Sequence, residues 1–305
     1  GAFFHDCDHN KHGNNIRFIC FNITTRTNST TTKSPMMSVP IEVCVDSISS
    51  AMSALYGGAN RLELCSALSE GGLTPTVGLL REVNQILADR DSEFCADKTI
   101  PVYCMIRCRG GGDFCYTDRE MRAMLCDLHE LLENNADGFV FGALDQCTGM
   151  VHRDHCEQVI KQAQGLSVTF HRAIDCTAEQ DLEQNLALIS ELGFRTVLTS
   201  GLRPTAEQGI ETIRKMKQIA TNLQKTTGKT IQVMAGSGVC SRNLATILQR
   251  TGCDWVHGSA SKLKPLNHIN RRLVERGHIV STAPLRVCDQ EVLEDWRHII
   301  DVLDE

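Results

Sequence analysis

Short apolar runs, each followed by glycine, charge, histidine or cysteine, recur along this chain between residues 42 and 260. Stretches with helix-like spacing of apolar residues separate them. The runs are EVCVD (42–46), RLELC (61–65), VYCMIRCRGGGDF (102–114), GFVFG (138–142), VTFHRAID (168–175), VLTSG (197–201), VMAGSG (233–238) and WVHGSA (255–260). Strands that alternate with helices form parallel sheets, and eight such units form a barrel. We therefore predict an α/β fold, a TIM-type (β/α)8 barrel, with functional residues at the C-terminal ends of its strands.

The predicted barrel domain occupies residues 39–305 and follows a segment of different character. Residues 1–38 are rich in Thr, Asn and His without sustained periodicity, so we expect a disordered tail there. Ser47 and Asp118 are the expected caps of the helices after the first and third strands. Residues 261–288 are basic and predict a long irregular connection. The apolar residues of EVLEDWRHIIDVL (291–303) recur at helical spacing, which predicts a last helix on the barrel wall or at a subunit contact.

Alternation within the runs separates an apolar face from a polar face. We expect the apolar face to meet the helices and the polar face to line the barrel lumen, where bulky aliphatic residues are usual. The residues assigned to the lumen are Glu42, Cys44, Arg61, Glu63, Cys65, Met105, Arg107, His171, Met234 and His257. One interpretation is a salt-bridged core in which the arginines neutralise the glutamates. The other is a ligand or metal site.

Two cysteines at strand ends give the sharpest chemical signal. Cys44 and Cys65 share one face of adjacent predicted strands, about 4.8 Å apart, so their sulfurs can approach one ion. Nearby arginines are expected to favour the thiolate form. Two thiolates, with the thioether of Met105 or Met234 in reserve, select Cu(I) over Mg²⁺ or Ca²⁺. Zinc would need further ligands from histidine, and plain packing of buried cysteines is the alternative to any metal.

Small residues after the last two strands predict a site for an anion. Backbone N–H groups can approach a phosphate where side chains are small. The residues expected to hold it are Gly236, Ser237, Gly238, Gly258 and Ser259. Arg107 and Arg109 flank a glycine loop, and the run HRAID places His171, Arg172 and Asp175 where acid–base chemistry is possible. Ordinary turns and loop anchoring are the alternative explanation.

Composition narrows the classes of function. The net charge of −6 over 305 residues argues against broad nucleic-acid binding. No run approaches the roughly 18 apolar residues of a membrane span, and residues 1–40 lack the apolar core of a signal peptide. The 15 cysteines are odd in number and lack framework spacing, which predicts reduced thiols in the cytoplasm.

The blocks EVCVDS, GGANRLELCSALSEGGLTPTVGLL, MIRCRGGGDFCYTDRE, DGFVFGALD, VTFHRAID, VLTSG, VMAGSGV and VHGSA, in this order, resemble the CutC family of copper homeostasis proteins. The resemblance covers roughly residues 40–260 and implies a cytoplasmic, self-associating TIM-type barrel linked to copper handling. It points to Cys44 and Cys65 as copper ligands and to the charged lumen and loop residues as family pocket positions. The family loop usually reads RPRGGDF. Here Cys108 replaces proline and one glycine is added, which predicts a looser loop.

Two functions follow, and a third stays open. The first is a cytosolic Cu(I)-binding protein that uses the strand-end cysteines. The second is a barrel enzyme of lyase or isomerase type that acts on a small anionic or phosphorylated substrate, with Glu42, Glu63, His171 or Asp175 moving protons. The third is an oligomeric scaffold based on the C-terminal helix. The expected partners are the copper ion, a small anionic ligand and further copies of the chain, with neither nucleic acid nor membrane among them.

Overall fold

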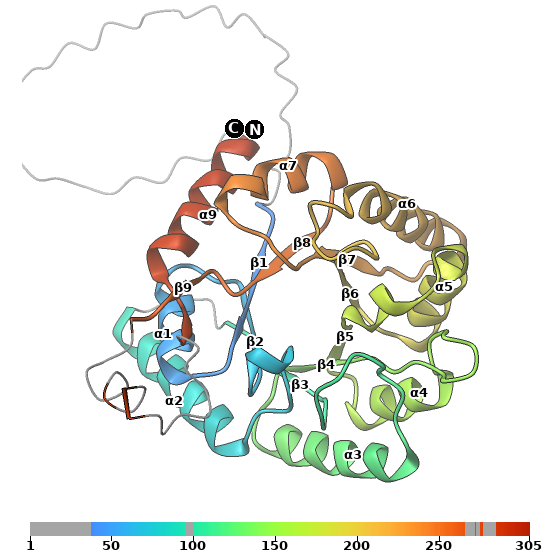
Figure 1. The fold of residues 1–305 in the computed structure, drawn as a ribbon, viewed down its shortest axis with the longest axis horizontal. Coiled ribbons are helices and arrows are strands. Elements are labelled where there is room, and N and C mark those ends of the chain that lie inside the picture. The colour runs from blue at the N-terminus through green and yellow to red at the C-terminus, as the bar shows by residue number, and fades with distance from the viewer. Residues whose placement is uncertain (1–37, 95–99, 266–271, 273–274, 277–284) are drawn as a thin grey trace, which may run out of the picture. The chain divides into compact units, whose positions relative to one another are not determined.

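Eight parallel strands close into a barrel in the computed structural model (Figure 1). The strands are β1 (Ile41–Val45), β2 (Arg61–Leu64), β3 (Val102–Met105), β4 (Gly138–Phe141), β5 (Ser167–Phe170), β6 (Thr196–Thr199), β7 (Gln232–Ala235) and β8 (Trp255–Gly258). Each strand pairs with the next, and β8 pairs with β1, so the barrel sheet has no open edge. The predicted fold class is confirmed. The structure describes residues 38–94, 100–265, 272, 275–276 and 285–305.

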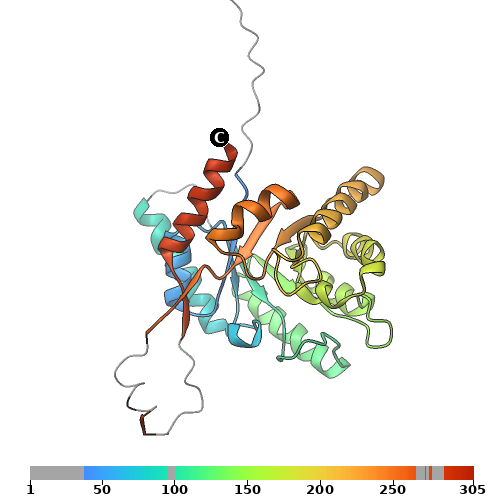
Figure 2. The same ribbon diagram turned by 45° about the horizontal axis from the view of Figure 1, so that its top comes forward.

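Helices surround the strands, as two views of the ribbon show (Figures 1 and 2). They are α1 (Ile48–Tyr56), α2 (Val77–Phe94), α3 (Asp118–Glu133), α4 (Arg153–Gln162), α5 (Leu182–Leu192), α6 (Ile210–Thr227), α7 (Ser241–Thr251) and α9 (Gln290–Asp304). Short 3-10 turns lie at Leu68–Glu70, Arg172–Cys176 and Glu179–Asp181. Within the described ranges, no helix combines the length and apolar character that crossing a membrane requires.

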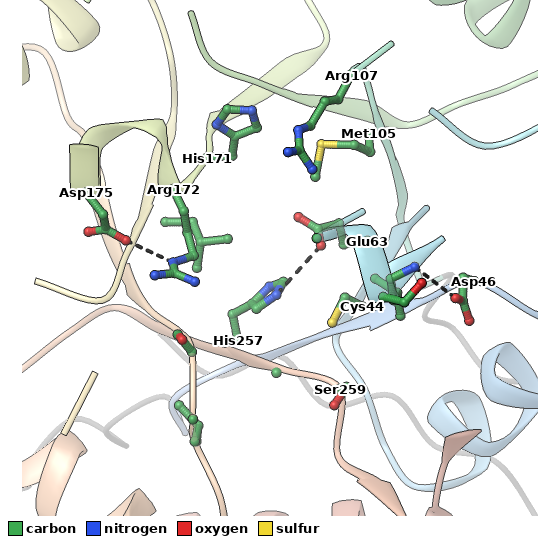
Figure 3. Close-up of a pocket in the computed structure, with 18 of the residues that line it drawn as sticks. Cys44, Asp46, Glu63, Met105, Arg107, His171, Arg172, Asp175, His257 and Ser259 are labelled. Atoms are coloured by element: carbon green, nitrogen blue, oxygen red, sulfur yellow. Dashed lines mark hydrogen bonds and ion pairs between the residues drawn. The ribbon is translucent and has the colours of Figure 1, made fainter. Parts of the chain in front are cut away.

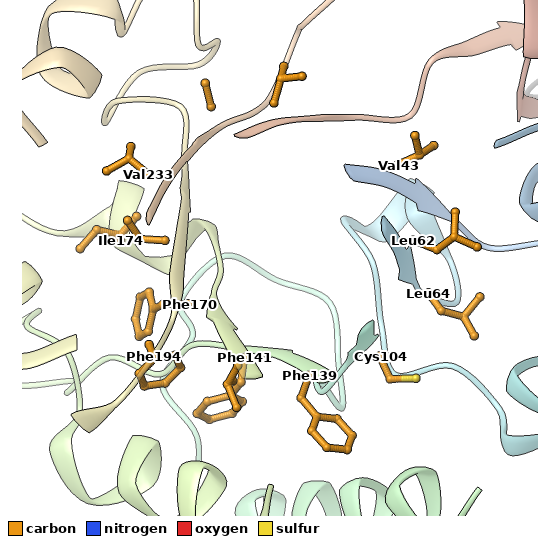
Figure 4. Close-up of a cluster of buried hydrophobic side chains, with 14 of the residues drawn as sticks. Val43, Leu62, Leu64, Cys104, Phe139, Phe141, Phe170, Ile174, Phe194 and Val233 are labelled. Carbon is orange, nitrogen blue, oxygen red and sulfur yellow. The ribbon is translucent and has the colours of Figure 1, made fainter. Parts of the chain in front are cut away.

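The hydrophobic core lies between the strands and the helices (Figure 4). Val43, Leu62 and Leu64 point away from the lumen and are fully buried. Phe170 and Phe194 pack edge to face with ring centroids 5.3 Å apart. Each such side chain contributes about 1.5–3 kcal/mol on burial. The apolar face of the alternating pattern therefore stabilises the fold, and the polar face is left for the lumen.

The segment after β8 is more regular than the sequence indicated. Ser261–Leu263 (β9) and Arg286–Cys288 (β10) pair as an antiparallel ribbon instead of an irregular connection. Residues 266–271, 273–274 and 277–284 lie outside the described residues, as do residues 1–37 of the tail predicted at 1–38. The predicted last helix is confirmed, because α9 contacts α1 and α7 and buries Leu293, Trp296 and Ile300.

Trp296 of α9 also explains a glycine at the end of β8. A Cβ atom at Gly258 would lie 2.7 Å from Cη2 of the Trp296 indole. That distance is too short for an ordinary contact, so glycine lets the C-terminal helix pack closely on the strand end. Gly258, which the sequence assigned to anion binding, therefore has a packing requirement of its own.

We predict that Gly258→Ala lowers the free energy of unfolding by about 1–3 kcal/mol, because the added methyl group overpacks the contact with Trp296. Chemical denaturation measures the change. The double variant Gly258→Ala/Trp296→Phe has a smaller opposing side chain. Its loss in free energy of unfolding should be smaller than the sum of the losses of the two single variants. Gly112→Ala is the matched control, because a Cβ there meets no atom within 4 Å. Equal effects of Gly258→Ala and Gly112→Ala would contradict the assignment.

Two arginines anchor the glycine loop between β3 and α3. Arg107 donates from Nη1 to the carbonyl oxygens of Glu70 (2.9 Å) and Gly72 (3.0 Å), and from Nη2 to that of Gly111. Arg109 donates from Nε to Glu120 Oε1 at 2.6 Å, and from Nη2 to the carbonyl of Cys115 at 2.9 Å. The loop is therefore tied to its surroundings even without the family proline.

The carboxylate of Glu120, which accepts from Arg109, also takes part in the cap at the start of α3. Thr117, and not the expected Asp118, is the N-cap, because its hydroxyl accepts the Glu120 N–H while Glu120 accepts the Thr117 N–H. The predicted cap at Ser47 is confirmed by its bond from the Ser50 N–H. Glu120 thus joins the helix start to Arg109 and the glycine loop.

Glu120→Gln should lower the free energy of unfolding by about 0.5–1 kcal/mol near neutral pH, since a partly exposed cap and ion pair have modest worth. Hydrogen bonds from Thr117 and then from Arg109 lower the pKa of Glu120 to about 2. A lowered folded-state pKa gives stability that is present above the unfolded value and lost on acidification. The difference in free energy of unfolding between parent and variant should therefore become smaller as the pH falls from about 5 towards 3. Denaturation at both pH values tests this, and a difference independent of pH would contradict it.

Candidate functional site

A cavity of about 1110 Å³ opens where the C-terminal ends of the barrel strands meet (Figure 3). It brings together residues far apart in the sequence, as the barrel topology requires. The sequence-predicted residues that line it are Cys44, Glu63, Met105, Arg107, His171, Arg172, Asp175, Ser237, Gly238, His257, Gly258 and Ser259.

Six predicted residues do not line this cavity. Glu42, Arg61 and Met234 contact one another or His257 in the buried lumen. Arg109 turns away to Glu120, and Gly236 packs where a Cβ would lie 2.6 Å from Leu198 Cδ1. Cys65, also absent from the cavity wall, is fully buried.

Sequence reasoning missed several lining residues, among them Asp46, Phe114, Arg203, Arg286 and Cys288. Asp46 shares the lumen face of the first strand with Glu42 and Cys44, so alternation alone was a usable signal for it. Arg286 and Cys288 reach the cavity only because β10 pairs with β9, and no local pattern in the sequence indicated that pairing.

A buried carboxylate organises the lumen below the cavity. Glu42 accepts a hydrogen bond from Arg61 Nε through Oε2, and its Oε1 lies 2.8 Å from His257 Nδ1. Arg61 stacks its guanidinium on the rings of Tyr103 and Trp255, at 4.3 and 4.0 Å from the centroids. Burial alone would raise the pKa of Glu42, but the charge of Arg61 and the bond from His257 lower it. Glu42 is therefore ionised. The salt bridge expected in the lumen forms between Arg61 and Glu42.

Above this network, three potential metal ligands converge. Cys44 Sγ, a carboxylate oxygen of Glu63 and a ring nitrogen of His257 all lie within 4.8 Å of one another. His257 donates to Glu42 through Nδ1. Its other ring nitrogen, Nε2, is therefore the one directed to Glu63, whose Oε2 is 3.7 Å away. A metal-binding histidine commonly gives its other ring N–H to a carboxylate, as His257 does to Glu42.

Strand register decides which cysteine joins this group. In the β1–β2 pairing, Cys44 stands opposite Glu63, and Cys65 follows the end of β2. Cys65 Sγ lies 3.7 Å from Glu63 Oε2 and packs with Tyr103 and Met105. Burial, followed by the charge of Glu63, raises the pKa of Cys65 well above its usual value. The expected thiolate at Cys65 is thus wrong for the metal-free protein, because Arg61 is directed to Glu42.

Glu63 has an unsatisfied oxygen. Its Oε1 is buried without a hydrogen-bond partner in the described part of the chain. Burial raises the pKa of Glu63 to about 7, with the charge of Glu42 acting in the same direction. Burial alone would lower the pKa of His257, but Glu63 and its other neighbours raise it. His257 is therefore protonated near neutral pH and Glu63 partly so, and a cation that binds between them must release protons.

Asp175 acts as a brace within the cavity wall. Its carboxylate accepts hydrogen bonds from Arg172 Nε (2.9 Å), Thr199 Oγ1 (2.6 Å), and the backbone N–H groups of Ser200 and Leu202. These bonds involve both carboxylate oxygens, so Asp175 is held to the loop after β6.

The loop after β7 has the backbone shape expected of an anion site. Ser237 and Gly238 adopt φ values of 78° and 69°, and the Ser237 hydroxyl donates to the carbonyl of Pro204. Within the described ranges, the N–H groups of Ser237, Gly238 and Val239 donate to no protein acceptor. Successive free N–H groups in such a turn form a concave nest that suits an anion.

Comparison with known proteins agrees with the barrel fold. Residues 39–262 match the CutC family. The copper homeostasis protein cutC homolog of Drosophila melanogaster is 44% identical over 73% of this chain and 77% of the relative. The human protein of that name is 41% identical over 72% of each chain.

Solved structures lead to the same family. A crystal structure of CutC from Streptococcus agalactiae has a TM-score of 0.64 and 30% identity, covering 72% of this chain and 98% of that chain. Deoxyribose-phosphate aldolase from Aeropyrum pernix, at 13% identity and a TM-score of 0.53, shares the fold alone. Since the family match spans the whole barrel and two relatives exceed 40% identity, this chain belongs to the CutC family.

Proposed function

We propose that this protein binds Cu(I) as cargo at the mouth of its barrel, in a cytoplasmic and self-associating form. The observation that carries the proposal is the convergence of Cys44, Glu63 and His257 within 4.8 Å. The curated relatives named as copper homeostasis proteins support copper as the ion. No helix in the described ranges suits a membrane span, which agrees with binding rather than transmembrane transport.

The donor set fits a soft or borderline metal ion. Cys44 supplies a thiolate and His257 an imidazole nitrogen, while oxygen-loving ions such as Mg²⁺ prefer sites built from carboxylates and carbonyls. Met105, on the same cavity wall, offers a thioether that favours Cu(I) further. Structural zinc would need four ligands, and the group within the described chain has three.

Cys65 is the second ligand in the sequence hypothesis, and its role stays a prediction. Its thiol must lose a proton before it can bind Cu(I), since the thiolate is the ligand. Glu63 Oε2, 3.7 Å from Cys65 Sγ, is an acceptor within the site. The two cysteines therefore need separate tests: Cys44 belongs to the convergent group, and Cys65 reaches the ion only after proton loss.

An anaerobic Cu(I) titration against a competing chelator tests the proposal. We expect Cys44→Ala to weaken binding by at least about 100-fold, because it removes the thiolate of the convergent group. Cys44→Ala/Cys65→Ala should lose tight binding altogether. Cys126→Ala removes an exposed thiol from α3 and is the matched control.

Parent-like affinity in the double variant would refute Cu(I) binding at the strand ends. Loss of affinity in Cys126→Ala as well would point to nonspecific thiol binding. If Cys65→Ala alone behaves as the parent, the ligands are Cys44 and His257, and Cys65 is a packing residue.

A second candidate function is favoured by the cavity itself. Its volume of about 1110 Å³ exceeds what one copper ion requires and is ample for a small metabolite. The free N–H groups at Ser237 and Gly238 support a barrel enzyme that acts on a small phosphorylated substrate. Glu63 is then the candidate proton carrier, since Asp175 is fully bonded.

Inorganic phosphate should bind at the loop after β7 if this second function holds. Crystals soaked in phosphate should show the anion within hydrogen-bond distance of the Ser237 and Gly238 N–H groups. These donors have no protein acceptor among the described residues, so hydrogen bonds from them would stabilise the bound anion. Sulfate is the matched dianion, and soaking in chloride alone is the control. An occluded loop with no ordered anion in either soak would count against the enzyme.

A further inference from the structure

Arg107 is a buried cation without a carboxylate partner. Its residue is 5% exposed, and within the described residues its guanidinium donates hydrogen bonds to the backbone carbonyls of Glu70, Gly72 and Gly111. No ion pair joins it to an acidic residue in the described part of the chain. Carbonyl dipoles offset part of the desolvation of a charge, but a buried cation is normally balanced by an anion.

His171 adds a neutral donor with nothing to donate to. Its Nδ1 accepts the backbone N–H of Ala173 at 3.1 Å, so Nδ1 carries no proton and the proton of the neutral ring resides on Nε2. Nε2 is buried and has no hydrogen-bond partner among the described residues. The residue is 4% exposed and lines the cavity, so the cavity wall contains an unsatisfied N–H.

The ring of His171 is held in place on two sides. A Cβ at Gly142 would lie 2.5 Å from His171 Nδ1, so the glycine backbone forms one wall. Phe114 packs on the ring with centroids 4.8 Å apart and also lies under the Arg107 guanidinium, at 5.2 Å. Phe114 therefore contacts both groups, and Figure 3 shows Arg107 and His171 on the same side of the cavity.

We propose that Arg107 and His171 form a binding subsite for the carboxylate of a small organic acid. Three of the five N–H groups of arginine are already used on carbonyls. At most two remain, and with His171 Nε2–H they make three donors in all. That number suits a planar monoanion, whereas a phosphate dianion would leave several acceptor oxygens without donors.

The histidine stays neutral between pH 5 and 8. Burial, followed by the charge of Arg107, lowers the pKa of His171 to about 3. The subsite therefore carries one positive charge, and its donors do not change between pH 5 and 8.

This subsite is distinct from the two sites proposed above. It uses neither the Cys44–Glu63–His257 group nor the backbone donors at Ser237 and Gly238. Binding of a carboxylate should consequently survive Cys44→Ala, so failure of the copper proposal and failure of this one can be told apart. A ligand long enough to reach both the subsite and the loop after β7 would carry a carboxylate at one end and a phosphate at the other.

The test is a titration of the copper-free full chain with pyruvate, followed through the side-chain ¹⁵N–¹H signals of labelled histidine. The His171 signal is assigned by its absence from His171→Phe. We expect pyruvate to shift the Nε2–H signal saturably, and pyruvamide, its uncharged counterpart, to leave it unchanged. Inorganic phosphate, the probe for the other loop, should not produce the same shift.

Variants measure the contribution of each donor. His171→Phe should weaken pyruvate binding by about tenfold or more, since it removes a donor to a charged acceptor. His171→Gln keeps an N–H donor and should recover part of the loss. Arg250→Gln changes an exposed arginine of α7 and is the matched control, expected to bind as the parent does. Thermal unfolding confirms that each variant folds.

Four outcomes would overturn the proposal. They are an unshifted His171 signal at high pyruvate, an equal shift with pyruvamide, unchanged affinity in a folded His171→Phe, and a larger saturable shift with phosphate than with pyruvate. The first two outcomes are read from the signal of the parent protein, and His171→Gln assigns that signal equally well if His171→Phe fails to fold.

Discussion

The buried carboxylate of Glu42 is the group on which the mouth of the barrel depends. Its two oxygens are bonded to different partners, Arg61 on one side and His257 on the other. The first bond neutralises a charge that the lumen would otherwise have to hold alone, and the second fixes the ring that faces Cys44 and Glu63. Removing one member of such a group leaves an uncompensated charge, which is strongly destabilising. The stability of the lumen and the orientation of the candidate metal ligand thus share one cause.

Polar groups lie at two depths in this barrel, and they differ in whether the protein satisfies them. Deep in the lumen, Arg61 and Glu42 satisfy each other, and Tyr103 and Trp255 cover the guanidinium. Nearer the mouth, Glu63 Oε1 and His171 Nε2 are buried and have no hydrogen-bond partner among the described residues. Unsatisfied buried groups cost free energy, and proteins tend to retain them where a ligand completes the bonding. Because Glu63 and His171 also line the cavity, their unsatisfied groups are positions at which a ligand is expected.

The sequence was sufficient for the barrel, for the last helix and for the polar lumen, since each depends on periodicity. It was insufficient for Cys65, because the relation of two strand-end side chains depends on register, and register placed Glu63 opposite Cys44. It was also insufficient for Arg109, whose direction is set by the carboxylate of Glu120 at the start of α3. The family resemblance supplied the copper expectation, which residue patterns alone left open between a metal site, an anion site and a packed core.

The ribbon formed by β9 and β10 gives the cavity a wall that is not part of the shared barrel. Residues 39–262 carry the family match, whereas Leu285, Arg286 and Cys288 line the cavity from beyond it. Two chains that agree closely over the matched region can therefore present differently shaped and differently charged entrances. Selectivity for what enters the barrel is free to diverge through this appended segment while the chemistry at the strand ends is kept.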